Sequence, residues 1–337
     1  MFYSLQLWKH PNIHYREALL RLSRCELFSM LRALSVFSEP VTENRGGAVF
    51  LTFESRELSP EELSYLSGHS CAAMLAEKRG DLLLPLSVQS PDSFSEDLPE
   101  ILKYKGKTNP TFTRMMLNTA RAVSAFSGGT ETLSVLDPVC GRGTTLFCAL
   151  CMGASATGVD LDRRDLKEAA DYFAAYLKEA GLKHSLRSFS LTVQGSGLPG
   201  KTFSFALSRE AFRAGDLKTL TLLEGDASAA GAALKKSPAH LLVADLPYGI
   251  QHAPQGSARP ESFTAFLHRV LPFWRKALRP GGAAALSFNT LTLKAADVRH
   301  ALEDADFLPL VSDEFTALSH PVEHAVVRDV VFATVPQ

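Results

Sequence analysis

The chain has 337 residues, of which 46% are hydrophobic and 21% are charged, and its formal net charge is -1. This composition is typical of a globular protein with a sizeable core and excludes a largely disordered chain. The near-neutral charge also excludes the strongly basic domain that would by itself indicate nucleic-acid binding, although a local basic patch is compatible with it. Because the length exceeds the roughly 100–200 residues of a usual single domain, we expect two domains.

Targeting and metal-binding signals are absent from the sequence pattern. Residues 1–10 contain no basic stretch followed by the apolar run that a secretory signal needs, and no apolar stretch reaches the roughly 18–20 residues that span a membrane. We therefore expect a cytoplasmic protein without a membrane partner. Cys140, Cys148 and Cys151 lie close together but lack a second pair or a histidine at ligand spacing, so we interpret them as buried thiols, with a metal or redox role as the alternative.

Residues 1–100 predict a smaller α/β domain. Phe2–Trp8 and 48–53 have the composition of strands, and 14–34 carries leucines and aromatics at helical spacing. Ser59-Pro60-Glu61-Glu62 is a capping box that starts another helix. Three arginines of the first helix, Arg16, Arg21 and Arg24, form either a solvated face or a contact surface for phosphates.

The second domain is predicted to span residues 103–337, after a linker at Gln89–Pro99 that is rich in serine, proline and acidic residues. Asn109 and Pro110 should begin a helix that runs to about Phe126. Strands and helices then alternate, which predicts a parallel sheet covered on both faces with its ligand at the carboxyl ends of the strands. The expected strands are 133–136, 156–160, 220–226, 241–245 and 283–288, and the expected helices are 144–152, 164–180, 262–278 and 295–305.

Three segments depart from this alternation. Phe189–Val193 and Thr202–Ala206 flank the glycine-rich residues 195–200 and predict an inserted, peripheral hairpin. Arg279–Gly282 predicts a turn before a strand. The final strands, 308–311 and 325–335, should pair antiparallel across a short connection around His320 and Pro321.

A glycine-rich loop follows the first predicted strand of the second domain. The sequence Asp137-Pro138-Val139-Cys140-Gly141-Arg142-Gly143-Thr144 opens a helix, which is the context in which backbone approaches a nucleotide cofactor; a simple tight turn is the alternative. The loop lacks the third glycine of the dinucleotide fingerprint and the Gly-Lys-Ser/Thr of a P-loop. Asp160, followed by Leu161, ends the next strand and is placed to accept ribose hydroxyls. Asp226, followed by Ala227, ends a third strand and is placed to accept from an adenine amino group.

This order of loop, ribose acid and adenine acid resembles the class I S-adenosylmethionine-dependent methyltransferases. The resemblance implies S-adenosylmethionine as the cofactor and a Rossmann-like, seven-stranded sheet that is mostly parallel with its last strand antiparallel. Upstream, Lys105–Arg114 precedes the first strand, and its N–H groups with Lys107 are placed to hold the cofactor carboxylate; an ordinary capped helix is the alternative.

The tetrad Asp245-Leu246-Pro247-Tyr248 ends a strongly apolar strand and matches the Asp/Asn-x-Pro-aromatic motif of amino-methyltransferases. The targets of this motif are exocyclic amines of bases or the glutamine amide, whose nitrogen lone pair is delocalised. The Asp245 carboxylate and the Leu246 carbonyl can each accept one N–H and favour a pyramidal nitrogen, so that positioning and electrostatics supply the catalysis. Tyr248 offers a face on which a flipped base can stack. A strand-to-loop turn with a surface tyrosine is the alternative.

Lys-Gly-Lys-Thr-Asn, Asp-Pro-x-Cys-Gly-x-Gly-Thr and Asp-Leu-Pro-Tyr-Gly together resemble the tRNA guanine-N2 methyltransferase group over residues 103–335. The resemblance implies an RNA partner, most simply tRNA, and an RNA-binding THUMP-like role for residues 1–100, for which the sequence offers only an α/β pattern. It implies substrate contacts at the tetrad, where Leu246 replaces the proline usual in the guanosine-10 enzymes. The predicted cofactor residues are Lys107, Thr108, Asn109, Asp137, Pro138, Cys140, Gly141, Gly143, Thr144, Asp160, Leu161, Asp226 and Ala227.

Several interpretations are compatible with these motifs. The same tetrad serves N6-adenine methylation of DNA or RNA and methylation of a protein glutamine amide. A scaffold that binds cofactor and RNA without catalysis is a hypothesis of another class. His320, Glu323, His324 and Arg328 in the last hairpin either contact substrate or cap a turn.

Overall fold

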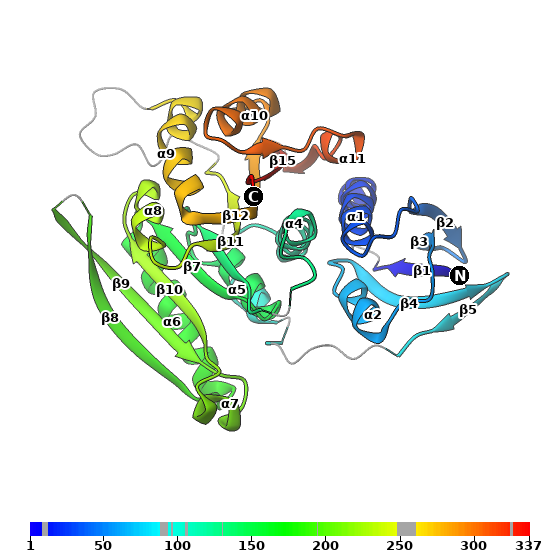
Figure 1. Cartoon of the computed structure of the whole chain (residues 1–337), viewed down its shortest axis with the longest axis horizontal. Helices are drawn as coiled ribbons and strands as arrows, with labels where there is room; N and C mark the ends of the chain where they lie inside the picture. Colours follow the sequence, from blue (N-terminus) through cyan, green and yellow to red (C-terminus); the bar gives the residue numbers. More distant parts are fainter. Residues whose placement is uncertain are drawn as a thin grey trace.

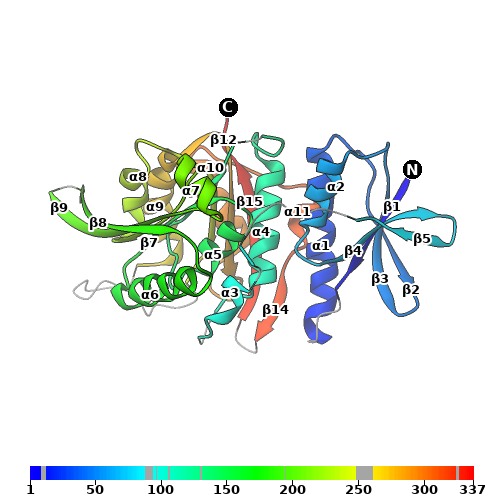
Figure 2. The same cartoon turned by 90° about the horizontal axis from the view of Figure 1, so that it is seen from below.

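The computed structural model describes residues 1–8, 13–87, 94–95, 97–104, 107–129, 131–193, 195–247, 261–323 and 326–337. The chain forms two sheets, each with its own helices, and the smaller sheet lies at the amino-terminal side of the molecule (Figure 1). Helix α1 (Ile13–Ala33) of the smaller unit and helix α4 (Pro110–Val123) of the larger one lie side by side in both views (Figure 2). The predicted smaller amino-terminal α/β unit is therefore confirmed.

The amino-terminal sheet has the strand order β2-β3-β1-β4-β5 within the described residues, and each adjacent pair is antiparallel. Helices α1 and α2 (Pro60–Ser67) cover one face of this sheet (Figure 2), where Leu5, Leu27 and Leu66 join a common buried core. The predicted capping box at Ser59 is confirmed: its hydroxyl accepts from the Glu62 N–H at 3.3 Å, and the Glu62 carboxylate accepts from the Ser59 N–H at 2.8 Å. The elements are β1 (Phe2–Leu7), α1 (Ile13–Ala33), β2 (Val41–Arg45), β3 (Ala48–Glu54), α2 (Pro60–Ser67), β4 (Ala72–Arg79) and β5 (Leu82–Pro85).

The larger sheet confirms the predicted alternation of strand and helix. In the part of the chain that the structure describes it has ten strands, in the order β13-β15-β12-β11-β6-β7-β10-β9-β8 with β14 paired to β15. The five strands from β12 to β10 are mutually parallel, whereas β15 runs antiparallel to β12. These central strands are β6 (Ser134–Asp137), β7 (Ser155–Asp160), β10 (Lys218–Glu224), β11 (Ala239–Asp245) and β12 (Leu278–Asn289), and the last is β15 (Val326–Thr334).

Helices cover both faces of this sheet, because successive strand side chains point to opposite sides. Val135 of β6 packs into a core with helices of one face, and the next residue, Leu136, packs with helices of the other. The first face carries α3 (Leu98–Ile101), α4 (Pro110–Val123), α5 (Thr144–Cys151) and α6 (Arg163–Glu179), and the second carries η1 (Ala227–Ala229), α8 (Ala230–Ala233), α9 (Phe263–Ala277) and α10 (Ala295–Asp304).

The predicted inserted, peripheral hairpin is confirmed, but its strands are longer than predicted. Strands β8 (His184–Val193) and β9 (Ser196–Phe205) extend the sheet by antiparallel pairing of β9 with β10, and helix α7 (Arg209–Ala214) follows them. The hairpin is the outer edge of the sheet, on the side away from the amino-terminal unit (Figure 1). Of the glycine-rich residues predicted to form the turn, Gly195 is in a turn and the other five belong to β9. Gly200 lies opposite Phe189, and a Cβ at Gly200 would collide with that ring.

Two further predictions near the carboxyl terminus need correction. Strand β12 is continuous through Pro280-Gly281-Gly282, with a register shift and a φ of +75° at Gly281 in place of the predicted turn. The final antiparallel pairing is confirmed, but His320 lies in an additional strand, not in a connection. Between β13 (Leu308–Pro309) and β15 the chain forms α11 (Asp313–Thr316) and β14 (His320–Glu323).

Among the described helices, none combines the length and the apolar character needed to cross a membrane.

Candidate active site

Four aspartates lie at or just beyond the carboxyl ends of parallel strands. Asp137 ends β6, Asp160 ends β7 and Asp245 ends β11, and Asp226 comes two residues after β10. The registers pair Asp160 with Glu224 and Asp137 with Gly158, so the four acids collect along one edge of the sheet. This is the edge at which an open α/β sheet binds its ligand.

The glycine-rich loop is bound to the Asp160 carboxylate. The Gly141 N–H donates to one carboxylate oxygen at 2.7 Å, and the Asp162 N–H donates to the other at 2.8 Å. Gly141 and Gly143 have φ values of +48° and +86°, which favour glycine, and Gly143 is the N-cap of α5. The loop and the predicted ribose acid thus form one unit.

The thiol of Cys140 points into the core beneath this loop. A Cβ added at Gly158 of β7 would come within 2.6 Å of the Cys140 sulfur, and burial raises the pKa of the thiol well above its usual value. Cys148 is also buried, whereas Cys151 is half-buried and donates to the Ser95 carbonyl. Among the described residues, no three His, Cys, Asp or Glu side chains group in a way that can hold a metal ion.

Asp137 is a buried acid that supports the loop from below. Its carboxylate accepts from the Val139 N–H at 3.1 Å. Burial raises its pKa to about 7, and the carboxylates of Asp160 and Asp245 act in the same direction, while the hydrogen bond from Thr145 opposes the shift. Pro138 follows Asp137 in the loop. At the other end of the loop, the Thr144 hydroxyl lies 2.9 Å from the Tyr104 hydroxyl.

Asp226 lies at the surface, with 38% of its side chain exposed. Its carboxylate caps the short helix η1 by accepting from the Ser228 N–H at 2.9 Å, and it pairs with Arg269 of α9 at 2.8 Å. Partial burial opposes ionisation, but the bonds from Ser228 and Arg269 outweigh it and lower the pKa of Asp226. Its neighbour Ala227 is buried, and Leu161 beside Asp160 is 55% exposed.

The segment before α4 contacts the tetrad more closely than the sequence indicated. The Lys107 ammonium donates to the carbonyls of Pro99 and Glu100, which lie within α3. The hydroxyl of Thr108 donates to the Asp245 carboxylate. Asn109 caps α4 as predicted, by accepting from the Thr111 N–H at 2.8 Å. Residues 105 and 106 lie outside the described residues.

Asp245 receives hydrogen bonds from three separate elements. Besides Thr108, the hydroxyl of Ser287 in β12 donates to Oδ1 at 2.8 Å, and the guanidinium of Arg328 in β15 donates to Oδ2 at 3.2 Å. The Leu246 N–H donates to the Ser287 carbonyl at 2.8 Å, which continues the pairing of β11 with β12 past the end of the strand. Pro247 is half-buried, and Tyr248 lies outside the described residues.

Sequence reasoning missed Ser287 and the role of Arg328. Ser287 is the register partner of Asp245, a relationship that becomes visible only when β11 and β12 are paired. Arg328 was grouped with His320, Glu323 and His324 as a substrate contact or a turn cap, and the structure instead directs it to Asp245. His320 is buried against Phe112, the side chain of Glu323 is not described, and His324 lies outside the described residues.

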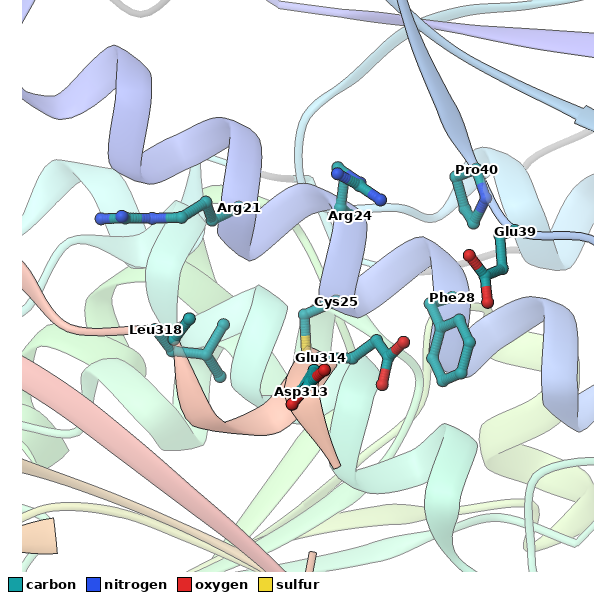
Figure 3. Close-up of a pocket in the computed structure, with 10 residues that line it drawn as sticks. Arg21, Arg24, Cys25, Phe28, Glu39, Pro40, Asp313, Glu314 and Leu318 are labelled. Carbon is teal, nitrogen blue, oxygen red and sulfur yellow. The ribbon is translucent and has the colours of Figure 1, made fainter. Parts of the chain in front are cut away.

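A separate cavity of about 260 Å³ lies between α1 and α11 (Figure 3). None of the four strand-end aspartates lines it. Arg21 beside it donates to the Ser319 carbonyl at 3.1 Å, so this arginine joins the two units. The lining residues are Arg21, Arg24, Cys25, Phe28, Glu39, Pro40, Asp313, Glu314, Ala317 and Leu318.

The strand order β10-β7-β6-β11-β12-β15, with β15 antiparallel and the glycine-rich loop after β6, decides the fold. The larger unit has the class I methyltransferase fold. The predicted fold class is thereby confirmed, although the insertion and the last hairpin enlarge the sheet beyond seven strands.

No family model and no curated protein matches the sequence. Solved structures with a similar fold include TrmN from Thermus thermophilus, with a TM-score of 0.40 and 17% identity over 91% of this chain and 64% of that chain. An rRNA methylase from Streptococcus thermophilus has a TM-score of 0.38 and 11% identity, over 68% of this chain and 98% of that one. A ribosomal protein L11 methylase from Lactobacillus delbrueckii subsp. bulgaricus has a TM-score of 0.36 and 12% identity, over 66% and 79% of the two chains. The fold assignment rests on the strand order.

The residues at the sheet edge fit S-adenosylmethionine. The glycine-rich loop approaches the edge without side chains at Gly141 and Gly143, and Asp160 and Asp226 lie beyond neighbouring strands for a ribose and an adenine. The assignment of the loop and the two acids to a cofactor site stays a prediction.

Proposed function

We propose that the chain is an S-adenosylmethionine-dependent N-methyltransferase that acts on an exocyclic amine of RNA, with guanine N2 of tRNA as its target. The observation that carries the proposal is the setting of Asp245. Its carboxylate ends β11 on the same sheet edge as Asp160 and Asp226, and donors from Thr108, Ser287 and Arg328 fix its orientation.

The cofactor half of the proposed site consists of the loop 137–144 and the two acids beyond β7 and β10. Asp160 would accept the ribose hydroxyls, and Asp226 would accept the adenine amino group beside its cap of η1. S-adenosylmethionine supplies an electrophilic methyl group on its sulfonium. Lys107, whose ammonium is engaged with backbone carbonyls, would act by supporting the segment at Thr108.

The substrate half of the proposed site works by orienting a weakly nucleophilic nitrogen. Asp245 and the Leu246 carbonyl would accept its two N–H groups, so that its lone pair points at the methyl carbon. The cofactor would supply the methyl group together with a neutral thioether as the leaving group. The nitrogen becomes positively charged, which the fixed Asp245 carboxylate stabilises before it accepts the surplus proton.

The choice of RNA rests on the motif resemblance over residues 103–335 and on the presence of an additional amino-terminal domain. That domain joins the catalytic one through α1, and its Arg21 contacts the segment that leads into β14. We propose that it binds RNA and presents one nucleotide to the tetrad. Tyr248 would stack on the extruded base.

The test is methyl transfer from labelled S-adenosylmethionine to tRNA, to rRNA, to DNA and to protein. We expect label in tRNA and its recovery as N2-methylguanosine after nuclease digestion. Label in N6-methyladenine or in glutamine would support one of the alternatives left open by the sequence. Cofactor binding by calorimetry without transfer to any substrate would support a non-catalytic scaffold. Absence of cofactor binding would contradict both the methyltransferase and the scaffold hypotheses.

The matched variant is Asp245→Ala. We expect turnover to fall by at least about 10²-fold, because the group that stabilises the charged nitrogen is lost. Cofactor affinity should stay within a few-fold of the original, since Asp160 and Asp226 are untouched. Unchanged turnover would contradict the proposed role of Asp245.

A further inference from the structure

Arg328 is a buried cation at the centre of the proposed catalytic edge. Its side chain is 3% exposed and that of Asp245 is 13% exposed, and their ion pair measures 3.2 Å. The pair spans three strands, because Asp245 of β11 lies opposite Ser287 of β12, and Arg328 of β15 lies opposite Asn289 of β12. An arginine placed so deeply is rare unless it is paired.

The surroundings of Arg328 fix it in place. Its guanidinium lies 5.1 Å from the ring centre of Phe112, which is on α4 shortly after Thr108. His320 of β14 is its register partner and lies 5.2 Å from the same ring. Burial lowers the pKa of His320 to about 4, and Arg328 and Arg21 act in the same direction. His320 is therefore neutral near pH 7, and the positive charge facing Asp245 is that of Arg328.

We infer that Arg328 is a positioning residue for Asp245, which holds the catalytic carboxylate in the orientation that accepts the substrate N–H. This inference rests on the proposed function. Thr108 approaches the same oxygen from the segment before α4 and Ser287 approaches the other from β12, so the carboxylate is held from three directions. The arginine fork cannot lose its charge and has a fixed planar geometry, which suits this task better than a lysine.

Energetics favour a positioning role over a stabilising one. A buried ion pair contributes little to stability compared with well-packed apolar residues, because removing both charges from water is costly. The Asp245 side chain also lies near Asp137, whose pKa it helps to raise, so a compensating cation is needed to keep two acids at one edge. Arg328 meets that need without contributing a proton of its own.

The first test uses Arg328→Met, Arg328→Lys and, as a control, Arg279→Met, which removes an exposed arginine paired with Glu131 in the same domain. We expect Arg328→Met to lower kcat about 10²-fold, the usual effect of misplacing a catalytic group by about 1 Å, with KM for RNA and cofactor affinity within about 3-fold. Arg328→Lys should have a higher kcat than Arg328→Met and recover about a third of the logarithm of the lost activity. Arg279→Met should match the original enzyme.

The second test places Arg328→Met in an Asp245→Asn background. Because a neutral amide needs no compensating charge, the added loss of kcat should be less than about 3-fold, and the two changes should not add. Full additivity, or a loss in KM alone, would overturn the inference. Cofactor binding by each variant checks that the variant is folded. If Arg328→Met no longer binds cofactor, Arg328→Lys takes its place in the same double-mutant cycle.

A third measurement separates this inference from the proposed function. The cycle of Asp245→Asn and Arg328→Met is repeated on urea unfolding of the whole protein, which requires no substrate. Coupling between the two positions in unfolding, together with absent methyl transfer by the original chain, would contradict the proposed function and leave the pairing intact. Absence of coupling in both unfolding and kcat, in a chain that methylates RNA, would overturn the role of Arg328 alone.

Discussion

Glu26 of α1 accepts a hydrogen bond from the Asn118 amide of α4 at 2.6 Å, with both side chains buried between the two units. The same carboxylate accepts from the Ser70 N–H at 2.7 Å and from the Ser70 hydroxyl, and His69 lies within 3.4 Å of it. Asn118 also donates to the Gly68 carbonyl at 2.9 Å. This buried polar network fixes the amino-terminal unit to the helix that begins just after Thr108.

We expect Glu26→Gln to lower the free energy of unfolding by about 1–3 kcal/mol, because an amide cannot accept from all of these buried donors and one is left unsatisfied. Urea unfolding measures the change. The control is Glu57→Gln, an exposed acid of the same unit, which should change stability by less than about 0.5 kcal/mol. Equal stability of the two variants would show that the network contributes nothing to the junction.

A second expectation concerns the cofactor half of the site. Asp160→Ala removes the acceptor for the Gly141 and Asp162 N–H groups and for the proposed ribose contact. Hydrogen bonds to a charged group are worth about 1.5–3 kcal/mol each, and the ribose hydroxyls would make two of them, so calorimetry should show an increase in the Kd for S-adenosylmethionine of at least about 10²-fold. At saturating cofactor, kcat should change only a few-fold.

The control for Asp160 is Asp171→Ala, which removes an exposed acid of α6 paired with Lys167. Its Kd should equal that of the original chain. A Kd that Asp160→Ala leaves unchanged would place the cofactor elsewhere, and the resemblance of the loop to a methyltransferase site would then be misleading.

Local patterns were enough to predict the central sheet and the edge at which its aspartates collect. The capping box at Ser59, the cap at Asn109 and the strand that ends at Asp245 each depend on residues within a few positions of one another. The prediction misplaced the hairpin turn because glycine occurs both in turns and in strands where a neighbouring side chain needs space. At Gly200 it makes room for the Phe189 ring on the opposing strand, where a turn would have been the ordinary interpretation.

The contacts of Asp245 were beyond any local pattern. Thr108 and Arg328 are separated from it by 137 and 83 positions, and only the order of strands brings them together. The same holds for His320, which was expected in a connection because a four-residue strand containing proline carries almost no periodic signal. Long-range pairing of this kind follows from tertiary packing and is not encoded in propensity.

A third expectation concerns pH and Asp137, whose pKa burial raises from 3.8 to about 7. Between pH 4 and pH 7 the unfolded chain has released this proton while the folded chain keeps it. Stability that is fully present below pH 4 is therefore lost as the pH rises to about 7. With about 1.4 kcal/mol for each unit of pKa, the loss reaches roughly 4 kcal/mol.

Comparison of the original chain with Asp137→Asn across this window isolates the effect. The variant cannot titrate there, so the difference in unfolding free energy between the two proteins should shift in favour of Asp137→Asn as the pH rises. Asp171→Asn, at an exposed position, should show no such shift over the same window. A constant difference between pH 4 and 7 would mean that Asp137 is ionised in the folded chain at all these values.

The last expectation concerns the packing beneath the cofactor loop. A Cβ at Gly158 would lie 2.5 Å from Leu146 Cδ1 and 2.6 Å from the Cys140 sulfur, and both side chains are buried. Since the backbone of Gly158 is not in the left-handed region, Gly158→Ala acts through this collision alone. We expect a loss of about 1–3 kcal/mol in unfolding free energy. Because Cys140 must move with its loop, the Kd for S-adenosylmethionine should also increase.

Gly128→Ala, at a glycine with no atom within 4 Å of the added Cβ, should change neither quantity. A normal Kd in a destabilised Gly158→Ala would show that the loop keeps its shape independently of the strand beneath it.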